Sequence, residues 1–304
     1  MGAILNWQRG AEMAPLRSLL ASFTPKSTPG LFTATITRAW MQGRTTYGGL
    51  SAALALEGAK RLLEDEELPL RSALVSFVGV AAGEVEIRAE IIRRNKTKGK
   101  GMAFVRGEVI ADGSLATTAM FAFGASRTSG FDEASGVTGP SSPLPGPGEC
   151  VSLFHGAGMR PNFTHNFEAL LAKGAPPVSG SDEDDSFVWV RHQGGDEDGG
   201  VSGVANDVAL LALADMLPPA VIPRFHEPAP ISSATWMINF LGSGSSYIQS
   251  EAEGWFLCRT KAEATRDGFS SQDMAMWGKG DKPVVVGRQT VAIYDKLPPH
   301  QSKL

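Results

Sequence analysis

The same order of apolar and polar positions occurs twice along the chain. Residues 47–63 and 204–217 each place apolar side chains at helical spacing, with Gly48-Gly49 before the first run and Pro218-Pro219 after the second. Each helical run is followed by strand-like runs, at residues 72–80, 84–93, 102–111 and 115–123 in the first half and at residues 234–240, 254–264, 269–277 and 284–293 in the second. One helix followed by a meander of long strands, repeated, predicts a duplicated α+β unit.

The first helical run carries small side chains on most of its faces, because alanines stand between its leucines. Such a helix can be wrapped by a curved sheet, so each half is expected to be a helix cradled by an antiparallel sheet. Residues 127–147 are rich in Ser, Gly and Pro and have no apolar periodicity, which is typical of a linker. The expected organisation is an N-terminal extension (residues 1–30), a first domain (31–126), a linker (127–160), a second domain (161–296) and a tail (297–304).

Composition narrows the function classes. Among 304 residues, 42% are hydrophobic and 20% charged, as in a soluble globular protein, and the net charge of −4 argues against nucleic-acid binding. Only Cys150 and Cys258 are present, without metal-ligand spacing, so neither a disulfide scaffold nor a structural zinc is expected. No apolar run has membrane-spanning length. Neither a Gly-x-Ser-x-Gly elbow nor a nucleotide-binding loop occurs.

The chain ends in Ser302-Lys303-Leu304, a peroxisomal import signal. The sequence therefore predicts a peroxisomal protein if the source is eukaryotic and a cytoplasmic one otherwise.

Short motifs at matching places in the two halves resemble the acyl-CoA thioesterase II family, which has a double hot-dog fold. In the first half they are Tyr47-Gly48-Gly49 at the helix start and the strand Val75-Ser76-Phe77-Val78-Gly79. In the second half they are Trp189-Val190-Arg191, Asn206-Asp207 at the helix start, Trp255-Phe256-Leu257, and Arg288-Gln289-Thr290 with its single Gln. Their order and spacing cover residues 32–295, almost the whole chain. The resemblance implies two helix-wrapped antiparallel sheets fused in one chain, hydrolysis of acyl-CoA thioesters without a cofactor, and possible homo-oligomers.

The resemblance also implies the site residues. In that family an Asp, a Thr or Ser, and a Gln activate a water molecule, and by motif these are Asp207, Ser233 and Gln289. The chain departs from the family at the middle residue: it reads Ser233-Ala234-Thr235-Trp236 where the family has Thr-x-Asp-His. Thr235 stays an alternative, because side chains two apart share a strand face. Gly48 and Gly49 are the expected substrate-binding residues, with a backbone N–H facing the thioester carbonyl.

The same residues also have purely structural interpretations. Asp207 suits a helix N-cap, Gly48-Gly49 suits close helix packing, and Ser233 and Gln289 suit exposed strand positions. The expected first-half counterparts of Ser233 and Gln289 are Leu70 and Ala119, which are apolar. A basic run at Arg93, Arg94, Lys96, Lys98 and Lys100 suits either CoA phosphates or a solvated hairpin.

Two other functions remain open from the sequence. A hot-dog enoyl-CoA hydratase needs an Asp and a His close together in one segment, whereas Asp207 has no nearby His. A non-catalytic acyl-CoA-binding module is the other alternative, because a fold does not dictate an activity.

Overall fold

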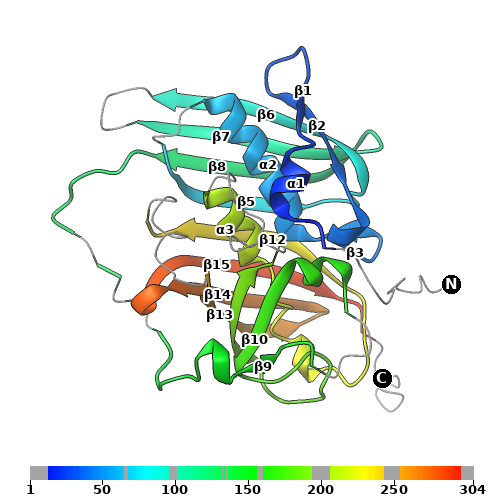
Figure 1. The fold of residues 1–304 in the computed structure, drawn as a ribbon, viewed down its shortest axis with the longest axis vertical. Helices are drawn as coiled ribbons and strands as arrows, with labels where there is room; N and C mark the ends of the chain where they lie inside the picture. The colour runs from blue at the N-terminus through cyan, green and yellow to red at the C-terminus, as the bar shows by residue number, and fades with distance from the viewer. Residues whose placement is uncertain are drawn as a thin grey trace.

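A computed structural model describes residues 13–64, 68–95, 101–155 apart from 132, 135 and 138, 160–193, 206–242 and 254–295. Within them, thirteen antiparallel strands form one sheet in the order β1-β2-β6-β7-β8-β5-β12-β15-β14-β13-β11-β10-β9 (Figure 1). The long strands are β2 (Leu31–Ile36), β5 (Leu70–Phe77), β6 (Gly83–Asn95), β7 (Met102–Ala111), β8 (Ser114–Gly124), β10 (Phe167–Lys173), β11 (Asp185–His192), β12 (Ile231–Phe240), β13 (Phe256–Arg266), β14 (Phe269–Gly278) and β15 (Lys282–Ile293). The short strands are β1 (Thr24–Pro25) and β9 (Val151–Ser152) at the sheet edges, and β3 (Met41–Gln42) and β4 (Thr45–Thr46), which pair with each other.

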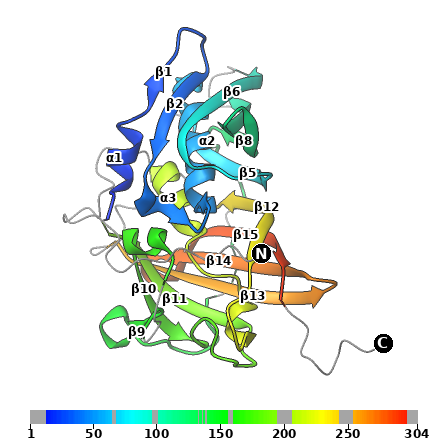
Figure 2. The same cartoon turned by 90° about the vertical axis from the view of Figure 1, so that its right-hand side faces the viewer.

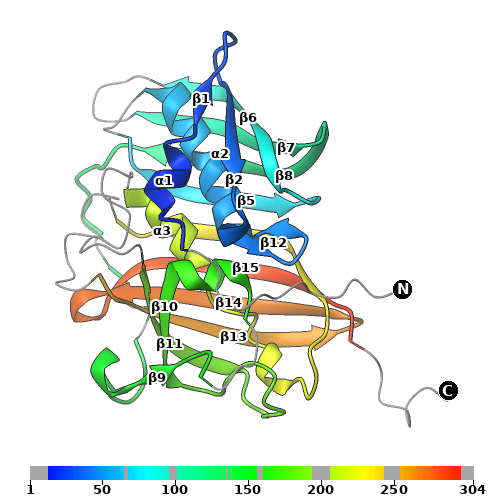
Figure 3. The same cartoon turned by 45° about the vertical axis from the view of Figure 1, so that its right-hand side comes forward.

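The two halves of the chain meet at the centre of this sheet. Strand β5 of the first half pairs antiparallel with β12 of the second, with Val75 opposite Trp236 and Leu74 opposite Met237. Figure 3 shows β5 and β12 side by side, with the strands of each half on either side. The eight predicted strand runs all occur, whereas β2 and β10 were not predicted because their apolar runs are short and mixed.

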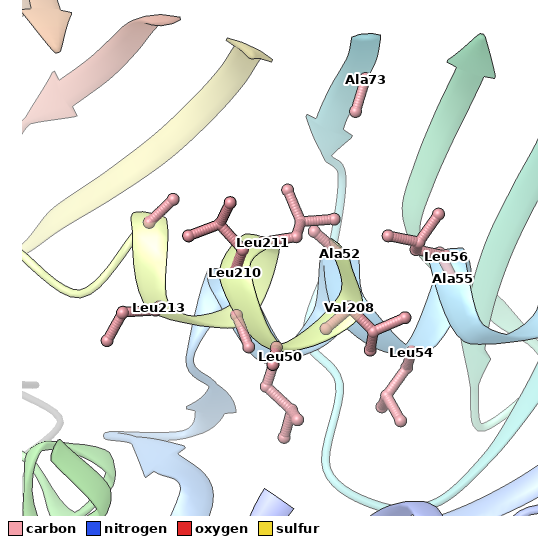
Figure 4. Packing of buried hydrophobic residues seen from close by; sticks show 14 of the residues in the cluster. Leu50, Ala52, Leu54, Ala55, Leu56, Ala73, Val208, Leu210, Leu211 and Leu213 are labelled. Carbon is pink, nitrogen blue, oxygen red and sulfur yellow. The ribbon is translucent and has the colours of Figure 1, made fainter. Parts of the chain in front are cut away.

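Two central helices lie on the concave side of the sheet, α2 (Gly48–Leu63) and α3 (Asn206–Ala214) (Figure 2). Eleven of the sixteen residues of α2 are buried, and residues 207–214 of α3 are at most 4% exposed. Helices that are apolar all round are stable only when covered on all sides. Figure 4 shows Val208 of α3 beside Leu54 of α2, and the two helices pack against each other as well as against the sheet.

The helices run antiparallel. Lys60, in the last turn of α2, contacts the start of α3, while Gly48 and Gly49 contact its end at Ala212 and Asp215. The N-terminus of each helix therefore lies beside the C-terminus of the other.

Each half has one β-bulge at a matching position. In the first half the register shifts between Leu70 and Ser72 opposite β8, and in the second between Ser233 and Thr235 opposite β15. Bulges locally reverse which face a side chain occupies and occur next to active sites.

Aligning the two bulges places Ser233 on Leu70, as expected from sequence. It places Gln289 on Phe121 rather than on the expected Ala119, because Val291 opposes Ser233 where Phe123 opposes Leu70. The first-half counterpart of Gln289 is therefore a fully buried aromatic residue.

None of the described helices is long and apolar enough to span a membrane. Residues 302–304 lie outside the described part, so the peroxisomal signal stays a prediction.

Candidate active site

Gln289 joins side chains from three separate segments. Its Nε2 donates to Asp215 Oδ1 over 2.9 Å and to Ser233 Oγ over 3.0 Å. Gln289 lies on β15 and Ser233 on the neighbouring β12, while Asp215 follows the last residue of α3. An amide has two N–H donors, and here both are used to hold a carboxylate and a hydroxyl beside each other.

The bulge in β12 decides which hydroxyl joins this group. Because the register shifts between Ser233 and Thr235, the two side chains do not share a face although they are two residues apart. Ser233 points inward to Gln289, whereas Thr235 is exposed opposite Ser76 and Thr290. Strict alternation along a strand could not distinguish them.

The carboxylate of Asp215 is enclosed although the residue as a whole is half-buried. It lies against Gly48, Gly49 and Gln289. Burial raises its pKa from 3.8 to about 7, against the opposing effect of hydrogen bonds from Gln289 and from the Gly49 backbone N–H. A carboxylate with a pKa near neutrality is well suited to accept a proton from water.

The glycine pair at the start of α2 is required by this arrangement. A Cβ atom on Gly48 would come within 2.7 Å of Asp215 Oδ2, and one on Gly49 would collide with the Tyr47 hydroxyl. That hydroxyl donates to the Ala212 carbonyl, so it ties the start of α2 to the last turn of α3. The Gly49 N–H, expected from sequence to face a substrate carbonyl, donates to Asp215 instead.

The structure does not bring Asp207 to Ser233 and Gln289. Its Oδ2 pairs with Lys60 Nζ at 2.8 Å, and its Oδ1 accepts from the Val208 N–H at 3.0 Å, at the opposite end of α3 from Asp215. Eight residues of helix separate the two carboxylates by about 12 Å. The buried, ion-paired environment of Asp207 is that of a residue that holds α3 against α2.

Sequence reasoning missed Asp215 because the family motif was placed at the start of the second helix. One signal is present: Asp215 is the polar residue that ends a wholly apolar run, three residues before Pro218-Pro219. In an antiparallel helix pair that end meets the glycine pair Gly48-Gly49 at the start of the other helix.

Other predicted binding groups are only partly described. Of the basic run, residues 96–100 lie outside the described part, and Arg94 Nη1 donates to the Leu63 carbonyl at 2.9 Å. Among the described residues, no group of three or more His, Cys, Asp and Glu side chains is placed to hold a metal ion.

Both halves of the chain match models of known protein domains. Residues 14–124 match the model of the acyl-CoA thioesterase N-terminal domain, and residues 143–293 match that of the acyl-CoA thioesterase C-terminal domain. Curated proteins gave no match.

Solved structures similar to this chain share the fold. A hot-dog protein of unknown function from Alicyclobacillus acidocaldarius has a TM-score of 0.78 at 19% identity, covering 94% of this chain and 100% of that one. The acyl-CoA thioesterase II of Mycobacterium marinum has a TM-score of 0.68 at 14% identity, covering 93% and 99%. The dehydratase domain of RzxB from Pseudomonas fluorescens has a TM-score of 0.51 at 11% identity, covering 87% and 94%. At these identities the likeness concerns the fold alone.

The predicted double hot-dog architecture is thus confirmed, and because the two domain models together match most of its length, the chain belongs to the acyl-CoA thioesterase family.

Proposed function

We propose that this protein hydrolyses acyl-CoA thioesters at one site per chain, formed by Asp215, Ser233 and Gln289. The observation that supports it most is the Gln289 amide, which hydrogen-bonds to both Asp215 and Ser233. Family membership supplies the reaction class, and the three hydrogen-bonded side chains supply a base and two hydrogen-bonding groups beside it.

In the proposed reaction, Ser233 and Gln289 orient a water molecule and Asp215 accepts its proton. The water oxygen bonds to the thioester carbonyl carbon, and the resulting intermediate expels the CoA sulfur. The proton held by Asp215 passes to the leaving thiolate, so the products are the free acid and CoA thiol, and the carboxylate is restored. The pKa of about 7 suits Asp215 to both transfers, because it can gain and lose a proton near neutral pH.

The decisive experiment compares Asp215→Asn with Asp207→Asn, two isosteric changes at opposite ends of α3. Thiol release from a panel of acyl-CoAs is followed for both variants. Asp215→Asn is expected to lower kcat by about 10²–10⁴, the usual contribution of a general base. Asp207→Asn should reduce thermal stability, since it weakens the pair with Lys60, while kcat stays within a few fold.

The opposite result, with activity lost in Asp207→Asn and kept in Asp215→Asn, would transfer the base role to the residue predicted from sequence. Undiminished turnover in both variants would contradict a carboxylate-based mechanism. Wild-type protein that binds acyl-CoA without releasing thiol would instead support the binding-module alternative.

A further inference from the structure

The polar groups of the candidate site continue across the inner face of the second-half sheet. Gln272 on β14 is the register partner of Gln289, and Thr260 on β13 is that of Ser186 on β11. The two pairs are linked, since Gln272 Oε1 accepts from the Thr260 hydroxyl at 3.4 Å and from the Ala220 N–H at 2.9 Å. Gln289, Gln272, Thr260 and Ser186 thus form a row of polar side chains across neighbouring strands, called here the polar track.

Two atoms of the polar track have no hydrogen-bond partner among the described residues. They are Gln272 Nε2 and Ser186 Oγ, on side chains that are only 2% and 5% exposed. The orientation of the Gln272 amide is fixed, because turning it over would point its NH₂ group at the Ala220 N–H. A buried polar atom without a partner costs roughly 1–3 kcal/mol, so each of these atoms needs a partner beyond the described residues, such as a water molecule or a substrate atom.

A small cavity lies at the end of the polar track. Ser186 and Thr260 line it together with Val188, Leu217, Pro219 and Ala220, and its volume of about 10 Å³ suits one water-sized group. Leu217 is two residues beyond Asp215 in the sequence, so the segment that carries the proposed base also supplies part of the cavity lining.

The fold itself does not require this polarity. Each half has a further bulge, between Ile91 and Arg93 in β6 and between Ala262 and Ala264 in β13. Aligning these bulges places Gln272 on Val105, which is fully buried. An apolar side chain fills the position in one half, so the polar one in the other half has a different use.

We infer that the acyl group lies along the polar track and that the preferred substrates are acyl-CoAs with a short acyl group bearing a hydroxyl or oxo substituent. This inference rests on the proposed thioesterase function. The substituent oxygen accepts a hydrogen bond from Gln272 Nε2 and lies against Ser186 Oγ. An unsubstituted alkyl chain would instead leave both buried groups without partners, and sites built to bind a substrate oxygen discriminate strongly against analogues that lack it.

The test measures kcat/KM by thiol release for two carbon-matched pairs: butanoyl- against 3-hydroxybutanoyl-CoA, and pentanoyl- against 4-oxopentanoyl-CoA. At least one substituted thioester should be preferred by about tenfold or more, as expected for a recovered buried hydrogen bond. In Ser186→Ala and Gln272→Met the preference should fall towards one. Ser186→Ala loses no described hydrogen bond of the chain and should fold normally, even if Gln272→Met does not.

Ser51→Ala is the matched control. Ser51 is a buried hydroxyl of α2 that bonds to Thr117 Oγ1 at 2.6 Å in the first half, and its loss should leave the preference unchanged. Equal rates within both pairs would mean that the cavity holds only water, and would overturn the inference while leaving the proposed function intact. A preference that survives both polar-track substitutions would overturn it too. If the wild-type protein released thiol from none of the four thioesters while Asp215→Asn behaved identically, the proposed function would fail as well.

Discussion

The two halves of this protein share one scaffold and differ in what they place on its inner face. At bulge-matched positions the first half buries Leu70, Val105 and Phe121, whereas the second carries Ser233, Gln272 and Gln289. The apolar half shows what the fold needs for stability. The polar half departs from it at three positions at once, and polar groups in such places are costly unless they are used. The comparison therefore locates the chemistry more sharply than either half alone.

Replacing a polar residue of the second half by an apolar one, as found in the first half, should have the largest effect on kcat. In Gln289→Leu the amide that holds Asp215 and Ser233 is replaced by an apolar side chain, and kcat should fall by about 10²–10³. The free energy of unfolding in urea should change much less, by about 1 kcal/mol. Thr290→Val, one residue along β15 and on the outer face, is the control and should retain activity. A fully active Gln289→Leu enzyme would show that the polar difference between the halves is not catalytic.

The pH dependence of kcat tests the same difference between the halves. Asp215, the carboxylate that Gln289 holds in the second half, has a raised pKa. Asp215 must be ionised to accept a proton, and its pKa is about 7, so kcat should fall about tenfold per pH unit below that value. Tyr47 on the α2 side is the neighbouring titratable group; burial and the nearby Asp215 raise its pKa well above its usual value, so it stays protonated. The residual activity of Asp215→Asn should lack this acid limb.

The same pKa predicts a stability difference. The folded-state pKa lies above the unfolded value of 3.8, so the protonated carboxyl favours folding, and the wild type should lose stability relative to Asp215→Asn as pH rises from about 4 to about 7. Urea unfolding of both proteins at pH 5 and pH 8 measures it. An unchanged difference between the two pH values would mean that the Asp215 carboxylate is solvated.

The smallest expected effects on kcat distinguish the hydroxyl of Ser233 from that of Thr235. Ser233→Ala removes the group bonded to Gln289 and should lower kcat about tenfold, the value of one hydrogen bond of about 1.4 kcal/mol. Thr235→Ala, on the exposed face, should leave kcat within about twofold. Steady-state thiol release measures kcat for both variants. Equal losses of kcat would show that the bulge does not select Ser233 as the hydroxyl of the site.

Much of the fold follows from the sequence because its helical and strand periodicities are long and punctuated by Gly and Pro. The predicted strand at residues 102–111 coincides with β7, and the first helix differs from α2 by one residue. The site was harder to predict, because it depends on which helix end meets which. Asp207 and Asp215 both border the same apolar run, and only the antiparallel packing of α2 and α3 shows which one lies beside Gln289. The bulge at Ala234 has no clear sequence signature either, so strand periodicity alone placed Ser233 and Thr235 on one face.

The hydrogen bond from Gly49 to Asp215 crosses between the repeats, since a backbone amide of the first steadies the proposed base of the second. The first repeat, which carries none of Ser233, Gln289 and Asp215, therefore still contributes a contact to the proposed site. If the first repeat were deleted, the second would lose a hydrogen bond to its proposed base, so selection for the proposed activity alone suffices to keep both repeats joined.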